Sequence, residues 1–107
     1  MRGRRRRGRF GRIPHPVKIG QTIQLKSMTP DPEGNPEPVY LEPAELEVIR
    51  LVDLEDLNQQ EAGERMDTSR GTIWRLLQSS RRKVTLALIE GRRIMIVKHS
   101  ENDTKEI

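Results

Sequence analysis

The spacing of apolar residues along positions 43–90 predicts three helices. The first is expected over about 43–55, with Pro43 at its first position, where the missing N–H leaves no hydrogen bond unmade. Glu45 and Glu47 fall early in this helix and complement its dipole. Its apolar side chains spread around much of a helical projection, so the helix needs cover on more than one side. Those side chains are Leu46, Val48, Ile49, Leu51, Val52 and Leu54.

Two further helices are predicted from their capping residues. Asn58 followed by Glu61 is a capping-box pattern for a helix that runs to about Met66. Ser69 caps a third helix that extends to about Glu90, with Gly91 as its stop. One face of the third helix is expected in the core: Ile73, Leu76, Leu77, Ser80, Val84, Ala87 and Leu88. The opposite face carries Thr72, Arg75, Ser79 and Arg82.

The other apolar positions predict short extended segments. Near alternation over 17–25 indicates an extended segment or short strand, and 39–41 and 92–97 read as strands able to pair as a small ribbon. The fold class is therefore mainly α, a three-helix domain with a possible β-ribbon. We divide the chain into a disordered Arg/Gly-rich arm (1–12), an extended segment with a Pro-rich loop (13–38), a helix-turn-helix domain (39–97) and a disordered tail (98–107).

The second and third helices form a helix-turn-helix pattern. Gly63 is small enough for close approach of the two helices, and Met66 and Ile73 are expected to pack in the angle between them. Asp67 occupies a turn position where the backbone often has positive φ. Ser69 leaves the N-terminus of the third helix free to point at a phosphate or a base edge.

Charge is strongly segregated along the 107 residues, which carry 20 Lys and Arg against 16 Asp and Glu. Residues 1–18 are purely basic, 31–67 are mainly acidic, and 69–93 are again mainly basic. Basic blocks attract polyanions, and an acidic block between them keeps the surface from being basic all round. The pattern favours a nucleic-acid partner over a generally solvated surface.

Several classes of function are disfavoured by composition. The chain has no cysteine, and its two histidines, His15 and His99, lie near opposite ends. Disulfides, thiolate nucleophiles and Cys-based zinc sites are thereby excluded, and no nucleophile–base pair is evident. Asp53, Glu55 and Asp56 cluster, but without supporting His or Cys we interpret them as a solvated helix end. We expect no enzymatic activity, no metal and no cofactor.

No apolar run approaches the roughly 18 residues of a membrane span. The basic N-terminus is not followed by the apolar stretch of a signal peptide. We therefore expect a cytoplasmic, nucleoid-associated protein.

Residues 41–90, with LEPAELEVIRL and DLEDLNQQEAGERMDTSRGTIWRLLQSSRRKVTLAL, resemble the helix-turn-helix of sigma factor region four. About residues 1–97 resemble the small prokaryotic proteins of domain-of-unknown-function family 134, also called uncharacterised protein family 0251. The Arg-rich stretch running into GRIPHPV is similar to that family's basic opening, and EGRRIMI to its closing strand. The family is described as predicted DNA-binding, so the resemblance implies a fold and a binding class but no target.

The resemblance implies a set of DNA-contacting positions. Groove contacts are expected from Ser69, Arg70, Thr72, Arg75 and Ser79, with Arg81, Arg82 and Lys83 nearer the phosphates. In the arm, phosphate contacts are expected from Arg4, Arg5, Arg6, Arg7, Arg9 and Arg12. Trp74 is expected to be partly buried against the arm or sheet rather than to act as a stacking platform.

The sequence predicts a transcriptional regulator that binds double-stranded DNA and reads the major groove with the helix starting at Ser69. The alternative is an RNA-binding or RNA-polymerase-associated adaptor with the same fold, since folds do not fix functions. A homodimer is also expected, because Leu86 and Ile89 fall outside the core stripe and the first helix is apolar on several sides.

Overall fold

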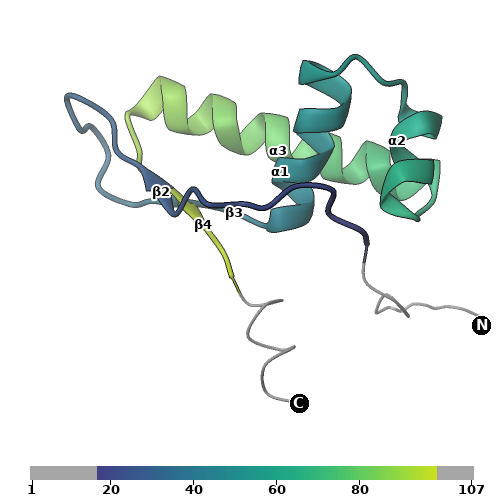
Figure 1. The fold of residues 1–107 in the computed structure, drawn as a ribbon. Helices are drawn as coiled ribbons and strands as arrows, with labels where there is room; N and C mark the ends of the chain where they lie inside the picture. The colour runs from purple at the N-terminus through teal and green to yellow at the C-terminus, as the bar shows by residue number, and fades with distance from the viewer. Residues whose placement is uncertain (1–16, 99–107) are drawn as a thin grey trace, which may run out of the picture.

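The structure, a computed structural model, describes residues 17–98 (Figure 1). Its helices are α1 (Pro43–Ile49), which continues into the π-helical turn η1 (Arg50–Leu54), α2 (Gln59–Met66) and α3 (Arg70–Glu90). Its strands are β2 (Ser27–Met28), β3 (Val39–Leu41) and β4 (Ile94–Ile96). The described part is mainly α with one small sheet, as predicted. The predicted arm and all but the first residue of the predicted tail lie outside the described residues.

In Figure 1, α1 crosses α3, α2 lies at the N-terminal end of α3, and the small sheet lies near its C-terminal half. The first helix spans the predicted range, but its last turn is wider than an α-helix. The Glu55 N–H donates to the Arg50 carbonyl oxygen at 2.9 Å, five residues back. Val48 and Leu51 are fully buried, and Val17 and Ile19 pack on the same core. The folded unit thus includes residues upstream of the predicted boundary at 39.

The predicted pairing of the two short strands is confirmed. Strand β3 pairs with β4 in parallel, with Val39 opposite Ile94 and Leu41 opposite Ile96. Strand β2 pairs antiparallel with the other side of β4, so the order is β2-β4-β3. Residues 17–25 form no strand, so of the two predicted alternatives the extended segment is correct. Contact with β4 begins at Lys26, whose carbonyl oxygen accepts a hydrogen bond from the Ile96 N–H at 3.0 Å.

The predicted core face of α3 is correct apart from one position. Ile73, Leu77, Ser80 and Ala87 are buried, and Leu76 and Val84 are half-buried. Leu88, which we assigned to this face, is instead 76% exposed. Leu88 is turned by about 100° from the buried Ala87, which takes its side chain off the core face.

The Pro-rich loop is fastened to the end of α3 by backbone contacts. The Gly34 N–H donates to the Gly91 carbonyl oxygen at 2.8 Å, and the Asn35 N–H donates to that of Glu90 at 2.9 Å. Gly91 ends α3 with φ of 62°, and a Cβ on it would lie 2.9 Å from the Gly34 nitrogen. Both the conformation and the close approach therefore require glycine here. Within residues 17–98 no helix combines the length and apolar character needed to cross a membrane.

Candidate nucleic-acid interface

Helices α2 and α3 meet through a short turn that has the predicted local geometry. Asn58 caps α2 and shares a capping box with Glu61, whose N–H donates to the Asn58 side chain at 2.8 Å. Asp67 ends α2 in the left-handed region, with φ of 58°. Ser69 caps α3 by accepting a hydrogen bond from the Thr72 N–H at 3.1 Å. The turn and both helix boundaries agree with the sequence prediction.

The two helices approach each other closely at Gly63. A Cβ added there would lie 2.8 Å from the Thr68 carbonyl oxygen and 3.6 Å from Ile73. Met66 and Ile73 are both fully buried and belong to one core cluster. The angle between α2 and α3 is therefore set by backbone contact at Gly63 and by these two side chains.

A chain of hydrogen bonds joins three of the predicted contact residues at the start of α3. The Ser69 hydroxyl donates to the Thr72 hydroxyl oxygen at 3.0 Å. The Arg75 guanidinium, one turn further on, donates to the same oxygen at 3.3 Å. Arg75 is exposed, so its guanidinium is oriented by Thr72 while its remaining donors face solvent.

Three other predicted contact residues of α3 are instead engaged by the first helix. Ser79 donates a hydrogen bond to one carboxylate oxygen of Glu45, and Lys83 lies 2.9 Å from the other. On the other flank of α3, Arg81 makes a two-point contact with Asp53, at 2.6 and 3.1 Å. We call these contacts the α1 grip, formed by Glu45, Asp53, Ser79, Arg81 and Lys83. Ser80, fully buried between the two flanks, faces the first helix.

The α1 grip shows that the basic residues of α3 do not form one continuous face of free charges. Burial raises the pKa of the Glu45 carboxyl, but hydrogen bonds from Glu42, Ser79 and Lys83 outweigh burial, and the net pKa is lowered. The hydrogen bond from Arg81 lowers the pKa of Asp53. Both carboxylates therefore stay charged at neutral pH and neutralise Lys83 and Arg81. These partners could not be predicted from the sequence, because helix patterns carry no information on which side chains of two helices face each other.

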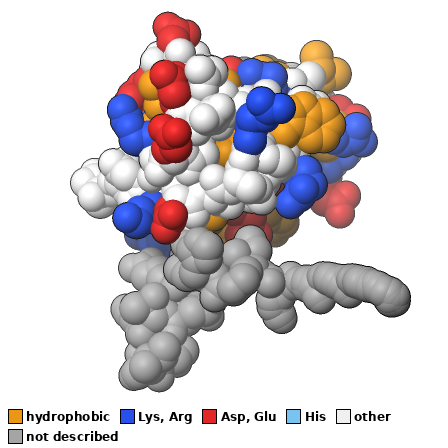
Figure 2. All heavy atoms as spheres, turned by 90° about the vertical axis from the view of Figure 1, so that its right-hand side faces the viewer, with side chains coloured by type: hydrophobic (Ala, Val, Ile, Leu, Met, Phe, Trp, Pro, Cys, Tyr) orange, Lys and Arg blue, Asp and Glu red, His pale blue; other side chains and the backbone are white. Residues whose placement is uncertain are grey.

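Arg70 and Arg82 remain exposed, and among residues 17–98 neither has a hydrogen-bond or ion-pair partner. By helical spacing, Arg75 and Arg82 share a stripe of α3 that points away from the first helix. Figure 2 looks onto the α2 end of the molecule and shows basic side chains around an exposed hydrophobic patch, with acidic ones on both sides of the view. The predicted contact set thus separates into an outward group (Ser69, Arg70, Thr72, Arg75 and Arg82) and the α1 grip.

Trp74 differs from the prediction of partial burial against the arm or sheet. Its side chain is 52% exposed, because Ile73 and Leu77 fill the core side of the same helical turn. Trp74 lies between Ile73 and Arg75 in sequence and therefore at the border of the outward group.

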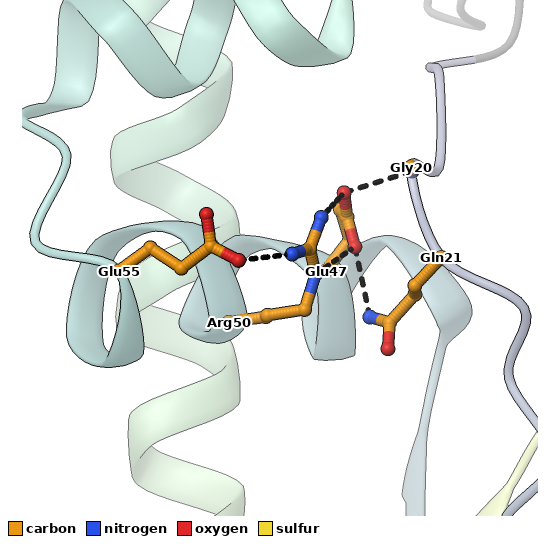
Figure 3. Close-up of polar contacts among 5 residues, drawn as sticks. All are labelled: Gly20, Gln21, Glu47, Arg50 and Glu55. Carbon is orange, nitrogen blue, oxygen red and sulfur yellow. Dashed lines mark hydrogen bonds and ion pairs between the residues drawn. The ribbon is translucent and has the colours of Figure 1, made fainter.

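The Glu47 carboxylate holds the N-terminal segment, because both of its oxygens accept hydrogen bonds (Figure 3). It accepts hydrogen bonds from the Gly20 N–H and the Gln21 amide, both at 2.8 Å. It also accepts two from the Arg50 guanidinium, at 3.0 and 2.8 Å, while Arg50 reaches Glu55 with its remaining nitrogen. Glu47 is only 1% exposed. Burial raises its pKa, but these hydrogen bonds outweigh burial and lower it overall.

A second contact places the beginning of the described chain beside the turn between α2 and α3. The Lys18 N–H donates to the Met66 carbonyl oxygen at 2.9 Å. The six arm arginines named above lie outside the described residues, but the chain that leads to them departs from this point. The first described residues therefore lie close to the N-terminal end of α3.

An open groove of about 650 Å³ lies between residues 21–25, the first helix and α3. Its walls include Ile23, Leu46, Ile49 and Val84, and exposed Leu54 stands at its side. Along α3 the same stripe continues to Leu88, which is 76% exposed, whereas Ile89, 78% exposed, lies by helical spacing on the stripe of Arg75 and Arg82. Part of the excess apolar surface expected from the sequence thus lies beside this groove.

Comparison with known proteins identifies the family to which this chain belongs. The chain belongs to the family described as "Protein of unknown function DUF134", whose model matches residues 2–105. It is 45% identical over 82 residues to a UPF0251 protein of Thermococcus kodakarensis, covering 74% of this chain and 73% of the relative. A UPF0251 protein of Archaeoglobus fulgidus is 36% identical over 91 residues, covering 85% and 87%.

A more distant relative is a UPF0251 protein of Clostridium beijerinckii, which is 45% identical over 65 residues. That match covers 61% of this chain but only 44% of the clostridial protein. No solved structure matches this chain significantly. The family predicted from the sequence is confirmed, and the names of these relatives state no activity.

Proposed function

We propose that this protein binds double-stranded DNA as a transcriptional regulator, with the N-terminal half of α3 in the major groove. The observation that carries the proposal is the outward group at the start of α3, beyond a tight turn from α2. In helix-turn-helix proteins the N-terminal residues of the second helix contact base edges. Here those positions hold Ser69, Thr72 and Arg75, which are already linked by hydrogen bonds.

Different basic residues are suited to different contacts. Arg75, held by Thr72, is suited to the two acceptors on the major-groove edge of guanine. Arg70 and Arg82 are free cations at either side of it and are suited to phosphates. Arg81 and Lys83 are neutralised in the α1 grip, so their role in this proposal is to fix α3 on the domain rather than to contact DNA.

The basic arm contributes affinity in this proposal. Lys18, the second residue that the structure describes, contacts Met66 at the turn, so the described chain begins close to the duplex that α3 would hold. An arginine-rich segment near the duplex would follow phosphates or enter the minor groove without strong sequence choice. Binding of this kind implies a nucleoid-associated location.

A second copy of this chain is part of the proposal. The groove and the protruding Leu54 and Leu88 occupy one face, so two copies related by a two-fold axis can each insert side chains into the other. The charges on this face are balanced, because Arg81 pairs with Asp53 and Arg50 with Glu47 and Glu55. The outward arginine Arg75 lies nearly two turns before the groove along α3, so a dimer leaves it free for DNA.

The alternative is an RNA-binding or RNA-polymerase-associated adaptor, for which the same outward arginines would serve. Selection of bound sequences from random duplex DNA by the full chain, with structured RNA as competitor, separates the two. Enrichment of a sequence with two-fold symmetry supports the regulator and the dimer together. Absence of enrichment, with RNA displacing the duplex, would reject the regulator in favour of the adaptor.

A further inference from the structure

Trp74 is the chain's single tryptophan and one of seven large apolar side chains that the described fold leaves exposed. Half of its surface is accessible, and among residues 17–98 its indole N–H has no hydrogen-bond partner. Isolated apolar residues on a surface are common and need no explanation by themselves. Trp74, however, lies in the second turn of α3 next to Arg75, which is a predicted DNA contact.

The surface beside Trp74 is open to a close approach. Gly71 precedes it by one helical turn, and the nearest atoms to a Cβ built there are Ser69 Oγ at 3.9 Å and an Arg75 nitrogen at 4.0 Å. Neither packing nor backbone conformation therefore requires glycine, although glycine inside a helix costs about 0.5–1 kcal/mol relative to alanine. The absence of a side chain at Gly71 lets a partner surface reach the flank of the indole.

The major groove of duplex DNA presents one apolar group to a bound protein. In the major groove, thymine presents its 5-methyl group, and apolar side chains recognise it by contact. A rigid α-helix fits that groove, whereas stacking on an aromatic ring requires bases that are splayed out of a duplex. The convex surface of α3, with Arg75 at the position next to Trp74, is suited to the first arrangement.

We propose that Trp74 reads a thymine by packing its indole against the 5-methyl group, next to the base pair contacted by Arg75. This inference rests on the proposed function and makes it more specific. It predicts a site that contains a thymine adjacent to the guanine contact, and it assigns a role in specificity to a residue outside the predicted contact set.

Replacing single thymines by deoxyuridine in the selected duplex tests the inference, because this removes only the methyl group. For the full chain, one replacement is expected to weaken binding about three- to tenfold, the effect of one buried methyl group. Trp74→Ala is expected to bind the thymine duplex more weakly and to lose the distinction between thymine and deoxyuridine. Tyr40→Ala, at an equally exposed aromatic residue on β3, is the control and should behave as the unmodified chain.

Trp74 also supplies a direct signal, since no other tryptophan contributes to the fluorescence. Its emission is expected to shift to shorter wavelength when the thymine duplex binds. Three results would overturn the inference: equal binding of thymine and deoxyuridine at every position, an equal deoxyuridine effect in Trp74→Ala, or tighter Trp74-dependent binding to the unpaired strand.

The same titrations separate this inference from the proposed function. If Arg75→Ala and Arg82→Gln weaken duplex binding while Trp74→Ala does not, thymine reading is wrong and the proposed function stands. If the full chain binds no duplex at all, both fall.

Discussion

Lys83 lies 2.9 Å from Glu45, so the middle of α3 is tied to the first helix. On the opposite flank of α3, Arg81 is tied to Asp53 at 2.6 Å. Arg82, the residue between Arg81 and Lys83, has no such partner among residues 17–98. Neighbouring basic residues of one helix therefore have different roles.

Arg82→Gln is expected to weaken binding to specific and scrambled duplexes alike and to reduce the salt slope by about one unit, as for one lost phosphate contact. Arg81→Gln removes the same formal charge but from a residue already paired, and should change the slope much less. Titrations of both variants at several salt concentrations measure this. Equal slopes for the two variants would show that the α1 grip does not withhold Arg81 from DNA.

The arm and α3 are expected to have separable contributions. Deleting residues 1–12 should weaken binding to all duplexes and flatten the salt dependence by about one unit for each lost phosphate contact. Arg75→Ala should cost about 1–3 kcal/mol on the preferred site and much less on random DNA, because a base contact is lost. If Arg75→Ala weakens binding to both duplexes equally, α3 is not reading bases.

Stability is expected to fall in mild acid because Glu45 and Glu47 are charged and hydrogen-bonded in the folded chain. Their folded pKa values lie below the ordinary value of 4.5. The unfolded chain therefore takes up protons first, and the stabilisation present above about pH 4.5 is lost as pH falls through the folded pKa values. Thermal unfolding measured between pH 7 and pH 3 checks this.

Glu47→Gln is the variant that tests the assignment. It should be less stable at neutral pH, by about 1–3 kcal/mol, because Arg50 loses its charged partner in a buried site. Its stability should also depend less on pH than that of the unmodified chain. Glu55→Gln, at a carboxylate 41% exposed, is the control and should change the pH dependence little. If the stability of Glu47→Gln falls with pH as steeply as that of the unmodified chain, other carboxylates cause the pH dependence.

Gly63→Ala and Gly71→Ala are expected to have opposite effects on stability. Alanine favours a helix over glycine by about 1 kcal/mol at either site. At Gly63, however, the new Cβ would lie 2.8 Å from the Thr68 carbonyl oxygen, so overpacking should destabilise the fold by about 1–3 kcal/mol. At Gly71 the space is open and the fold should be slightly stabilised. Urea denaturation of both variants measures the difference; a stable Gly63→Ala would mean that α2 and α3 are not in close contact.

The proposed dimer predicts that Leu54→Glu and Leu88→Glu yield monomers. Both side chains are about three-quarters exposed, so a charged replacement should leave the fold of each subunit unchanged. Light scattering at tens of micromolar, with circular dichroism to check the fold, measures the mass. A monomer in the unmodified chain, with and without DNA, would rule out the dimer.

Much of this fold is local and was predicted from the sequence. The capping box of Asn58 and Glu61, the turn at Asp67, the Ser69 cap and the stop at Gly91 depend on residues within a few positions of each other. Periodicity also located Ile73 and Leu77 in the core, since a helix repeats its faces at a fixed angle. The family was likewise recognisable from the order of motifs along residues 1–97.

The tertiary structure decided which charges are free. No local pattern pairs Glu45 with Lys83 or Asp53 with Arg81, because these residues are separated by 38 and 28 positions and meet only where the first helix crosses α3. The same crossing buries Glu47 against Gly20 and leaves Leu88 and Trp74 exposed. Sequence periodicity fixes the direction of a side chain on its own helix, but only packing determines which residue lies opposite it. The packing of the first helix on α3 therefore decided which arginines are paired and which face outward.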